Sequence, residues 1–386
     1  MALADVLGVQ ADLAKAGMLN LAPVALPTIP ALGSLFVNLT ARCNLACVHC
    51  FRGDADARCL DLAVVKTLVD DLVAAGGRSI VLSGGEPLLY PHIKELLGYI
   101  GRRLKVQLAT NGTLLDREWA EFLAATLNPV IQISLEGATA AVHDPIRGKG
   151  SFDRSIQAVR HLQAVGLGEK LIFSTTIMNQ NRGTLPAIVA LAAELAVPTV
   201  RFLLLRNEGH ASETWQLTGE ALGRNQYEDL FEQFLAHPGA MPPGVEVRCG
   251  LSGFFFDPSL GDPDKRHWCD LGKLMVVDVD GEVYPCALMM EGGFRLGSVL
   301  TDSLADLHAC AALAEVCHAV ANRHRQASGC AQCLWNTFCQ AGCLALAYRE
   351  QGTIWAHDSF CSYRKGAYAR GFDRILGAGK PGPTGA

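Results

Sequence analysis

Three cysteines near the start of the chain, in the sequence CNLACVHC, have a spacing that suits metal chemistry. Cys43, Cys47 and Cys50 form a CxxxCxxC pattern. Three thiolates at this spacing can hold three irons of a 4Fe–4S cluster and leave the fourth iron without a protein ligand. Because an open iron can bind a further molecule, the pattern predicts a site at which a reaction begins.

A second group of cysteines lies in the C-terminal part of the chain. Its members are Cys269, Cys286, Cys330, Cys333, Cys339, Cys343 and Cys361. Their CxxC pair also suits tetrahedral zinc, but the upstream CxxxCxxC pattern favours iron and sulfur. The N-terminus lacks the basic start of a secretory signal peptide. We therefore expect reduced thiols in the cytoplasm rather than a disulfide scaffold.

Alternating strand-like and helix-like segments must position these cysteines. Strands are predicted at 34–40, 79–83, 105–110, 130–137, 170–178 and 199–205, and helices at 60–77, 92–103, 116–126, 151–166 and 185–196. This alternation implies parallel strands joined by right-handed crossovers. Six strand–helix units are too few for a complete eight-unit barrel, so an open, partial barrel is predicted. A hairpin at 273–285 and a helix at 303–320 are predicted further along.

Polar and glycine residues follow several of the predicted strands. The cysteine loop follows the first strand, and Ser83–Pro87, with the sequence SGGEP, ends the second. Glycines allow a backbone to approach a ligand closely. In parallel α/β folds the working groups sit on loops at the carboxyl ends of the strands. We therefore expect these segments to meet at one end of the barrel.

The CxxxCxxC unit followed by GGEP resembles the radical S-adenosylmethionine (SAM) family. The resemblance implies an α/β fold: a partial (β/α)6 radical SAM barrel followed by a small cysteine-rich α+β SPASM domain. It also implies that the amino and carboxylate groups of SAM chelate the open iron of a 4Fe–4S cluster. One electron from that cluster then cleaves SAM to methionine and a 5′-deoxyadenosyl radical, which abstracts hydrogen from the substrate.

The same resemblance implies which residues bind SAM. The GGEP segment would meet the SAM amino group, a residue at the fourth strand the ribose, and an arginine the SAM carboxylate, which suits a forked guanidinium. His49 stands where the family usually has an aromatic residue near adenine. A surface salt bridge for Arg147 and an ordinary loop position for His49 remain alternatives. The predicted SAM-binding residues are His49, Gly84, Gly85, Glu86, Pro87, Asn111, Ser134, Glu136 and Arg147.

The C-terminal cysteines resemble the SPASM domain, an extension of some radical SAM enzymes. Two auxiliary iron–sulfur clusters are thereby implied. Cys269, Cys286 and Cys343 would serve the first, with Cys249 a candidate fourth ligand, and Cys330, Cys333, Cys339 and Cys361 the second. The predicted domains are an N-terminal arm at 1–33, the barrel at 34–205, a connector at 206–248 with a helix at 218–236, the SPASM domain at 249–375 and a disordered tail at 376–386.

The composition of the chain limits the kinds of molecule that the protein is expected to bind. The formal net charge of −5 argues against a general nucleic-acid surface. Residues 16–41 are uncharged, but Pro23, Pro27 and Pro30 interrupt them, so no membrane span is expected. By resemblance, a flavodoxin or ferredoxin would donate electrons.

The resemblance points to oxidative modification of a ribosomally made peptide or small protein. Sulfatase-maturing relatives carry an aspartate directly after the cysteine that matches Cys286, but this chain has Ala287. Formation of formylglycine is therefore not favoured. Only 42 residues precede Cys43, too few for a winged-helix recognition domain, so we expect a leader-bearing peptide to be recognised by a separate partner protein or by the short N-terminal arm. The alternatives are a porphyrin side-chain-modifying enzyme and a non-enzymatic metal-binding or electron-transfer protein.

Overall fold

A computed structural model describes residues 29–53, 55–127, 129–218, 242–249, 269–290, 292–362, 364–366 and 368–369. The chain divides into two compact units. The barrel unit comprises Ala31–Gly250 and Gly272–Cys310, and the C-terminal unit comprises Met1–Pro30, Leu251–Leu271 and Ala311–Ala386. Each unit is described by itself.

One ten-stranded sheet forms the centre of the barrel unit, in the order β10-β9-β8-β1-β2-β3-β4-β5-β6-β7. The strands are β1 (Ser34–Thr40), β2 (Ser79–Gly84), β3 (Lys105–Thr110), β4 (Val130–Ser134), β5 (Leu171–Thr176), β6 (Thr199–Leu203), β7 (Glu246–Cys249), β8 (Leu274–Val277), β9 (Glu282–Tyr284) and β10 (Gly297–Ser298). β8 and β1 to β7 pair in parallel, whereas β9 and β10 are antiparallel. The predicted open α/β barrel is confirmed, and β7 and β8 extend it.

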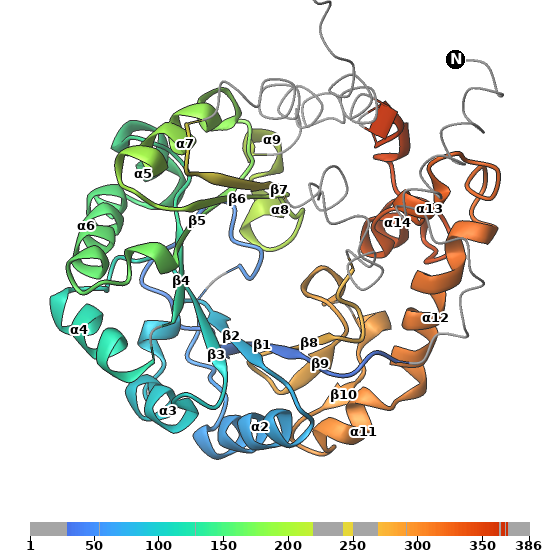
Figure 1. The fold of residues 1–386 in the computed structure, drawn as a ribbon, viewed down its shortest axis with the longest axis horizontal. Helices are drawn as coiled ribbons and strands as arrows, with labels where there is room; N and C mark the ends of the chain where they lie inside the picture. The colour runs from blue at the N-terminus through green and yellow to red at the C-terminus, as the bar shows by residue number, and fades with distance from the viewer. Residues whose placement is uncertain are drawn as a thin grey trace, which may run out of the picture. The chain divides into compact units, whose positions relative to one another are not determined.

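Helices cover the outer face of this curved sheet (Figure 1). They are α2 (Leu62–Ala74), α3 (Ile93–Ile100), α4 (Arg117–Thr126), α5 (Ala140–Arg147), α6 (Ser151–Ala164) and α7 (Leu185–Glu194). α2 and α4 begin at aspartate caps: Asp61 accepts a hydrogen bond from Ala63 N at 2.7 Å, and Asp116 accepts one from Trp119 N at 2.9 Å. α5 follows β4 directly and was not predicted as a helix.

Alternate residues of each strand face the helices. Leu35, Val37 and Leu39 on β1 are completely buried, as are Val65 and Leu72 on α2. Burying each such side chain stabilises the fold by about 1.5–3 kcal/mol. The opposite face of the sheet is more polar, and there the Gln107 side chain donates to that of Gln132 at 2.8 Å. The apolar core thus lies between sheet and helices and leaves the inner face for chemistry.

The segment from Gly272 to Cys310 belongs to the barrel unit by its contacts. β8 pairs in parallel with β1, so the predicted hairpin of β8 and β9 extends the barrel sheet. α11 (Leu304–His308) follows within the same unit. The proposed domain boundaries at 33, 205, 248 and 375 stay predictions.

The C-terminal unit contains α12 (Ala311–Gln326), α13 (Asn336–Cys339) and α14 (Leu344–Gln351). The helix predicted at 303–320 is two helices, because α11 ends at His308 and α12 begins at Ala311. The predicted connector helix beyond Thr218, most of the N-terminal arm and the tail lie outside the described residues.

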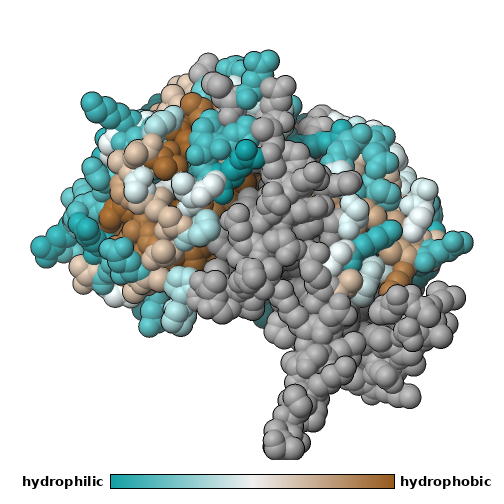
Figure 2. Space-filling model, turned by 90° about the horizontal axis from the view of Figure 1, so that it is seen from above, coloured by the Kyte–Doolittle hydropathy of each residue, from teal (hydrophilic) through white to brown (hydrophobic). Residues whose placement is uncertain are grey.

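Among the described residues, one stretch, Leu304–Gln326, is long and apolar enough to span a membrane by length and composition, and an 18-residue window within it has a mean hydropathy of 1.3. This is weak evidence of a span, because core helices of soluble proteins pass the same test. The surface in Figure 2 mixes hydrophilic and hydrophobic residues. The large apolar side chains exposed in the described part of the chain are Val73 and Leu300.

Candidate active site

The cysteine loop follows β1 at the carboxyl end of the parallel strands. A turn brings Cys50 N to 3.1 Å from Cys47 O. Burial, opposed by the guanidinium of Arg147 and assisted by the nearby thiols of Cys50 and Cys43, raises the pKa of the Cys47 thiol to about 11. Burial also raises the pKa of Cys43. Free thiols in such a setting need a cationic centre to hold them as thiolates, and iron supplies one.

The two glycines of GGEP are required by a close backbone approach. A Cβ on Gly84 would collide with Thr40 O, and one on Gly85 would collide with Arg42 O and lie 2.8 Å from Ala41 O. Gly85 N donates to Thr40 O at 2.7 Å, and Glu86 N donates to Arg42 O at 2.8 Å. The end of β2 therefore binds the backbone that leads directly into Cys43.

Glu86 braces the ends of β2 and β3. Its side chain is fully buried, and burial raises its pKa. The carboxylate accepts hydrogen bonds from Leu88 N at 3.2 Å, Thr110 Oγ1 at 2.7 Å and Asn111 N at 2.8 Å. Pro87 follows it as the first residue of a buried 3-10 turn, Pro87–Leu89. The Glu86 carboxylate is thus bound by protein donors, which gives it a positioning role besides the predicted ligand role.

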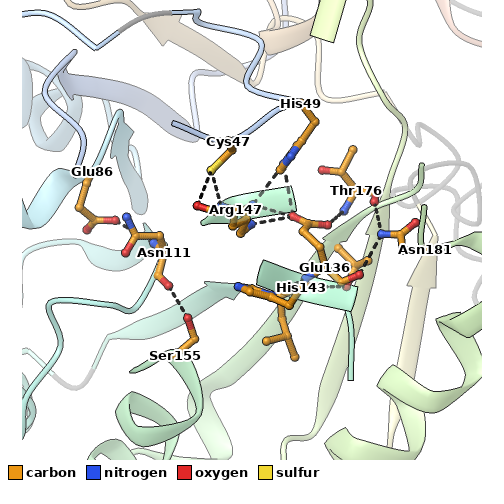
Figure 3. A network of polar contacts seen from close by, with 12 residues as sticks. Cys47, His49, Glu86, Asn111, Glu136, His143, Arg147, Ser155, Thr176 and Asn181 are labelled. Atoms are coloured by element: carbon orange, nitrogen blue, oxygen red, sulfur yellow. Dashed lines mark hydrogen bonds and ion pairs between the residues drawn. The ribbon is translucent and has the colours of Figure 1, made fainter. Parts of the chain in front are cut away.

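Asn111 links β3 to the cysteine loop, and Figure 3 shows its contacts with Glu86 and Ser155. Its Nδ2 donates to Asn44 Oδ1 at 3.0 Å, and its Oδ1 accepts from Thr113 N at 2.9 Å. Ser155 Oγ donates to the Asn111 carbonyl at 2.9 Å. Because Asn44 directly follows Cys43, the predicted ligand Asn111 holds the start of the cysteine loop.

Glu136 and Arg147 form a buried ion pair. Arg147 Nη2 and Nε lie 2.6 and 3.0 Å from Glu136 Oε1, and Thr176 N donates to Oε2 at 2.7 Å. Burial opposes ionisation of Glu136, but Arg147 and His49 outweigh it and lower its pKa to about 2. Because Glu136 is fully buried and ionised, it depends on Arg147 for its charge balance.

Arg147 also reaches the cysteine loop. Its Nη1 lies 3.7 Å from Cys47 Sγ, and Nη2 lies 3.4 Å from His49 Nε2. Val48 N donates to Ile146 O at 3.0 Å, so the end of α5 packs on the loop. The structure thus brings Glu136, Arg147 and His49 together at the predicted site, beside the thiol of Cys47.

His143 belongs to the same network but has no signal in the sequence. Its Nδ1 accepts a hydrogen bond from Glu136 N at 3.1 Å, which assigns the ring proton to Nε2. Burial, then Arg147, lowers the pKa of His143 to about 4. A neutral imidazole therefore supports the backbone of Glu136. Asn181 Nδ2 supports it from the other side, at 3.0 Å from Glu136 O.

Ser134 ends β4 beside Ser174 of β5. It is half-buried, and within the described residues no hydrogen-bond partner engages its hydroxyl. The buried Nδ1 of His49 also lacks a partner among those residues. A polar ligand such as a nucleoside can satisfy both groups, so the residues present fit SAM.

A short segment after β6 holds the cysteine loop from its other side. It runs from Gly209 through α8 (His210–Glu213) to Thr214, and we call it the strap. His210 N lies 2.9 Å from Cys50 O, and Thr214 Oγ1 donates to Val48 O at 2.7 Å. A ring nitrogen of His210 lies 3.2 Å from Cys47 O. Sequence reasoning missed the strap because single polar residues in a connector carry no pattern.

Substitution of Gly209 with alanine should therefore impair the cysteine loop. Gly209 has φ of +54°, and a Cβ there would collide with Gly53 N and lie 2.6 Å from Cys50 O. We expect less iron at this loop and a cluster absorbance reduced by more than half after reconstitution. Gly166→Ala is the matched control, because Gly166 also has positive φ, +82°, but open space around it. It should cost about 1 kcal/mol of stability and leave iron content unchanged. Equal iron in both variants would contradict the role of the strap.

The four thiols predicted for the second auxiliary cluster lie together in the C-terminal unit. Cys330, Cys333, Cys339 and Cys361 line one small cavity with Trp335, Arg364 and Tyr368. Burial, then the three neighbouring thiols, raises the pKa of Cys330 to about 11. Within the described residues, no three His, Cys, Asp or Glu side chains converge as they would on a single metal ion. The four thiols share one cavity, as the ligands of a single cluster would.

The ligands predicted for the first auxiliary cluster fall in both units. Cys269 and Cys343 belong to the C-terminal unit, and both act electrostatically on Arg323. Cys286 belongs to the barrel unit, where it precedes the 3-10 turn Ala287–Met289. The side chain of Cys249 lies outside the described residues. This ligand set stays a prediction.

Comparison with known proteins identifies the class that this fold and site define. Residues 37–192 match the model of the radical SAM superfamily, and residues 269–334 match that of the SPASM iron–sulfur cluster-binding domain. The chain belongs to the radical SAM superfamily and carries a SPASM domain. It is an enzyme that binds SAM, a 4Fe–4S cluster and auxiliary iron–sulfur clusters. The alternative of a non-enzymatic metal protein is therefore wrong.

Particular relatives narrow the comparison. Mycofactocin maturase MftC of Mycolicibacterium smegmatis is 31% identical over 90% of this chain and 86% of its own. Fe-coproporphyrin III synthase of Methanosarcina barkeri is 28% identical over 85% of this chain and 87% of its own. The solved structure of native anSMEcpe with bound AdoMet and Cp18Cys peptide superposes with a TM-score of 0.69 at 20% identity, over 89% of this chain and 98% of that one. This last likeness concerns the fold alone.

Proposed function

We propose that this enzyme uses the reductive cleavage of SAM to modify a ribosomally made peptide oxidatively, by a thioether, a crosslink or a related change. The observation that carries the proposal is the similarity to a mycofactocin maturase over 90% of the chain. The auxiliary cysteines support it, because an oxidation requires an electron to leave the substrate and clusters can accept one.

The residues of the barrel unit have separate tasks in this proposal. Cys43, Cys47 and Cys50 would hold the 4Fe–4S cluster, which would supply the electron that cleaves SAM. The backbone of the GGEP segment would bind the SAM amino group, the hydroxyl of Ser134 would bind the ribose, and His49 would contact the adenine. The Glu136–Arg147 pair orients the SAM carboxylate and keeps a positive charge near Cys47, at 3.7 Å from its sulfur. Glu86 and Asn111 position the loop.

Other partners follow from the same reading. The cluster needs an external donor of low potential, for which a flavodoxin or ferredoxin is suited. A separate peptide-recognition protein would present the precursor. Both, together with a cytoplasmic location, are parts of the proposal.

A triple substitution of Cys43, Cys47 and Cys50 with alanine tests the SAM chemistry. Reduced, reconstituted enzyme should release 5′-deoxyadenosine and change the mass of a precursor peptide in the presence of its recognition protein. The triple variant should do neither. Cys59→Ala is the control, because Cys59 is an exposed thiol outside both cysteine patterns and should behave like the parent. Persistent cleavage of SAM by the triple variant would sink the proposal.

Porphyrin side-chain modification is the second candidate, favoured by the similarity to Fe-coproporphyrin III synthase at 28% identity. This identity is lower than the 31% shared with the mycofactocin maturase, so we rank porphyrin modification below peptide modification. Incubation of the reduced enzyme with SAM and an iron porphyrin distinguishes the two. A loss of porphyrin mass coupled to 5′-deoxyadenosine, with no change in any precursor peptide, would move the assignment to porphyrin.

A further inference from the structure

A completely buried ion pair lies among the cysteines of the C-terminal unit. Asp358 and Arg364 have no exposed surface. Arg364 Nη1 donates to Asp358 Oδ2 at 3.0 Å, and Nη2 donates to Oδ1. Two charges lose their hydration in such a place, and their mutual attraction repays this only with good geometry and further hydrogen bonds.

The Asp358 carboxylate binds backbone beside two predicted cluster ligands. Cys343 N donates to Oδ2 at 2.6 Å, and Phe360 N donates to Oδ1 at 3.1 Å. Cys343 is assigned to the first auxiliary cluster. Phe360 directly precedes Cys361, which is assigned to the second. One carboxylate thus fixes the main chain at a ligand of each cluster.

The Arg364 guanidinium reaches a cluster ligand directly. It lines the same cavity as the four cysteines of the second cluster and hydrogen-bonds the Cys339 thiol. It also fills the space at Gly342, where a Cβ would collide with Nη2. Gly342 directly precedes Cys343. Glycine at position 342 therefore leaves the space that this guanidinium occupies.

A second buried arginine supports the same turn. Arg323 is 1% exposed, and it donates to Ala356 O at 2.9 Å and to Gly342 O. It holds the backbone of the turn, whereas Arg364 contacts a thiol. Both arginines lie close enough to cluster cysteines to act on them electrostatically, but Arg364 is the one that hydrogen-bonds a thiol.

We propose that Asp358 and Arg364 form a positioning pair shared by both auxiliary clusters, in which Arg364 raises the reduction potential of the cluster held by Cys339 and Asp358 moderates that effect. The inference rests on the proposed ligand assignment. Reduction makes a cluster more negative, and a guanidinium that hydrogen-bonds a ligand sulfur stabilises the added charge. The carboxylate opposes it, so the potential reflects their balance.

Because Arg364 and Asp358 carry opposite charges, neutralising one should shift the midpoint potential in the opposite direction from neutralising the other. We use the full chain with Cys43, Cys47 and Cys50 replaced by alanine, so that only auxiliary clusters remain, and titrate it anaerobically by electron paramagnetic resonance. Arg364→Gln should lower the midpoint potential of the cluster held by Cys339 by about 59 mV. For one electron, this shift is a tenfold change in the equilibrium constant for reduction. Asp358→Asn should raise the midpoint potential. Arg364→Lys, which keeps a charge, should recover part of the loss.

Arg325→Gln is the matched control, because Arg325 is an exposed arginine on α12 and should leave both potentials unchanged. If Arg364→Gln does not fold, the paired substitution Asp358→Leu with Arg364→Met removes both charges at similar volume, and the lost hydrogen bond to Cys339 should still lower the potential. Unchanged midpoints in a background that binds iron and sulfide for two clusters would overturn this inference alone. A background that binds no such clusters would overturn the ligand assignment and this inference with it.

Discussion

Replacement of Gly85 with alanine is expected to lower SAM cleavage about 100-fold, because a displacement near 1 Å of reacting groups has an effect of this size. The added Cβ would collide with Arg42 O and crowd Ala41 O, and both are backbone atoms that cannot rotate away. The cysteine loop must therefore shift at its first ligand. Overpacking of this kind also destabilises a fold by about 1–3 kcal/mol.

Gly98→Ala is the matched control for Gly85→Ala. Gly98 lies within α3, where a Cβ meets nothing within 4 Å, so alanine should stabilise the helix by roughly 0.5–1 kcal/mol and leave catalysis unchanged. The measurements are 5′-deoxyadenosine formation and the iron retained at the first site. Parent-like cleavage by Gly85→Ala would show that the collision is relieved without moving Cys43.

The second large effect is expected at the Glu136–Arg147 pair. Arg147→Met leaves the Glu136 carboxylate fully buried without its main counter-charge. Removal of one partner of a buried pair costs about 3–5 kcal/mol, measured as a lower midpoint of urea unfolding for the metal-free protein at pH 7. SAM affinity should fall as well.

The sign of the pH dependence follows from Glu136. In the parent its pKa is lowered to about 2, from 4.5, so the pair stabilises the fold above pH 4.5 and loses this effect as the pH falls towards 2. In Arg147→Met, burial raises the pKa of Glu136, and the penalty disappears once the carboxyl is protonated. The stability difference between parent and variant should therefore shrink as the pH is lowered. A constant difference would contradict the ion-pair explanation.

Two further variants separate charge from volume. Adding Glu136→Gln to Arg147→Met removes the unpaired carboxylate and should restore much of the lost stability but not SAM binding. Arg117→Met is the surface control, because its pair with Glu121 is largely exposed, and solvent screens such pairs. It should leave the unfolding midpoint unchanged.

The regular features of this chain could be predicted from its sequence. Apolar alternation located β1 to β6, and the spacing of cysteines and glycines located the loop after β1 and the turn after β2. These signals are local, because a strand, a helix or a ligand loop repeats residues at short intervals. Of the predicted site residues, Glu86 and Asn111 form polar contacts at the start of the cysteine loop, and Glu136, Arg147 and His49 form a second group beside Cys47 (Figure 3).

What the sequence did not reveal depends on contacts between distant residues. α5 contains Pro145, and proline disfavours helix interiors. The ion pair between Arg147, at the end of α5, and Glu136 helps to hold this helix in place. Only the tertiary structure brings His143, Thr176 and the strap to the site, and none of them belongs to a pattern in the sequence. Likewise, no short-range pattern predicts that Gly84 and Gly85 approach the backbone of Thr40–Arg42. The break between α11 and α12 was missed because apolar periodicity continues across Ala309 and Cys310.

The pairing of β1 with β8 bears on how the chain is made. Asn38 on β1 donates to Asp278, 240 residues later, at 2.9 Å. Until a ribosome has released that later segment, β1 has only β2 beside it and presents an open hydrogen-bonding edge, which invites aggregation. Nascent protein therefore carries its first three cluster cysteines next to an unfinished sheet, and shorter gene fragments that stop before β8 should accumulate as insoluble material.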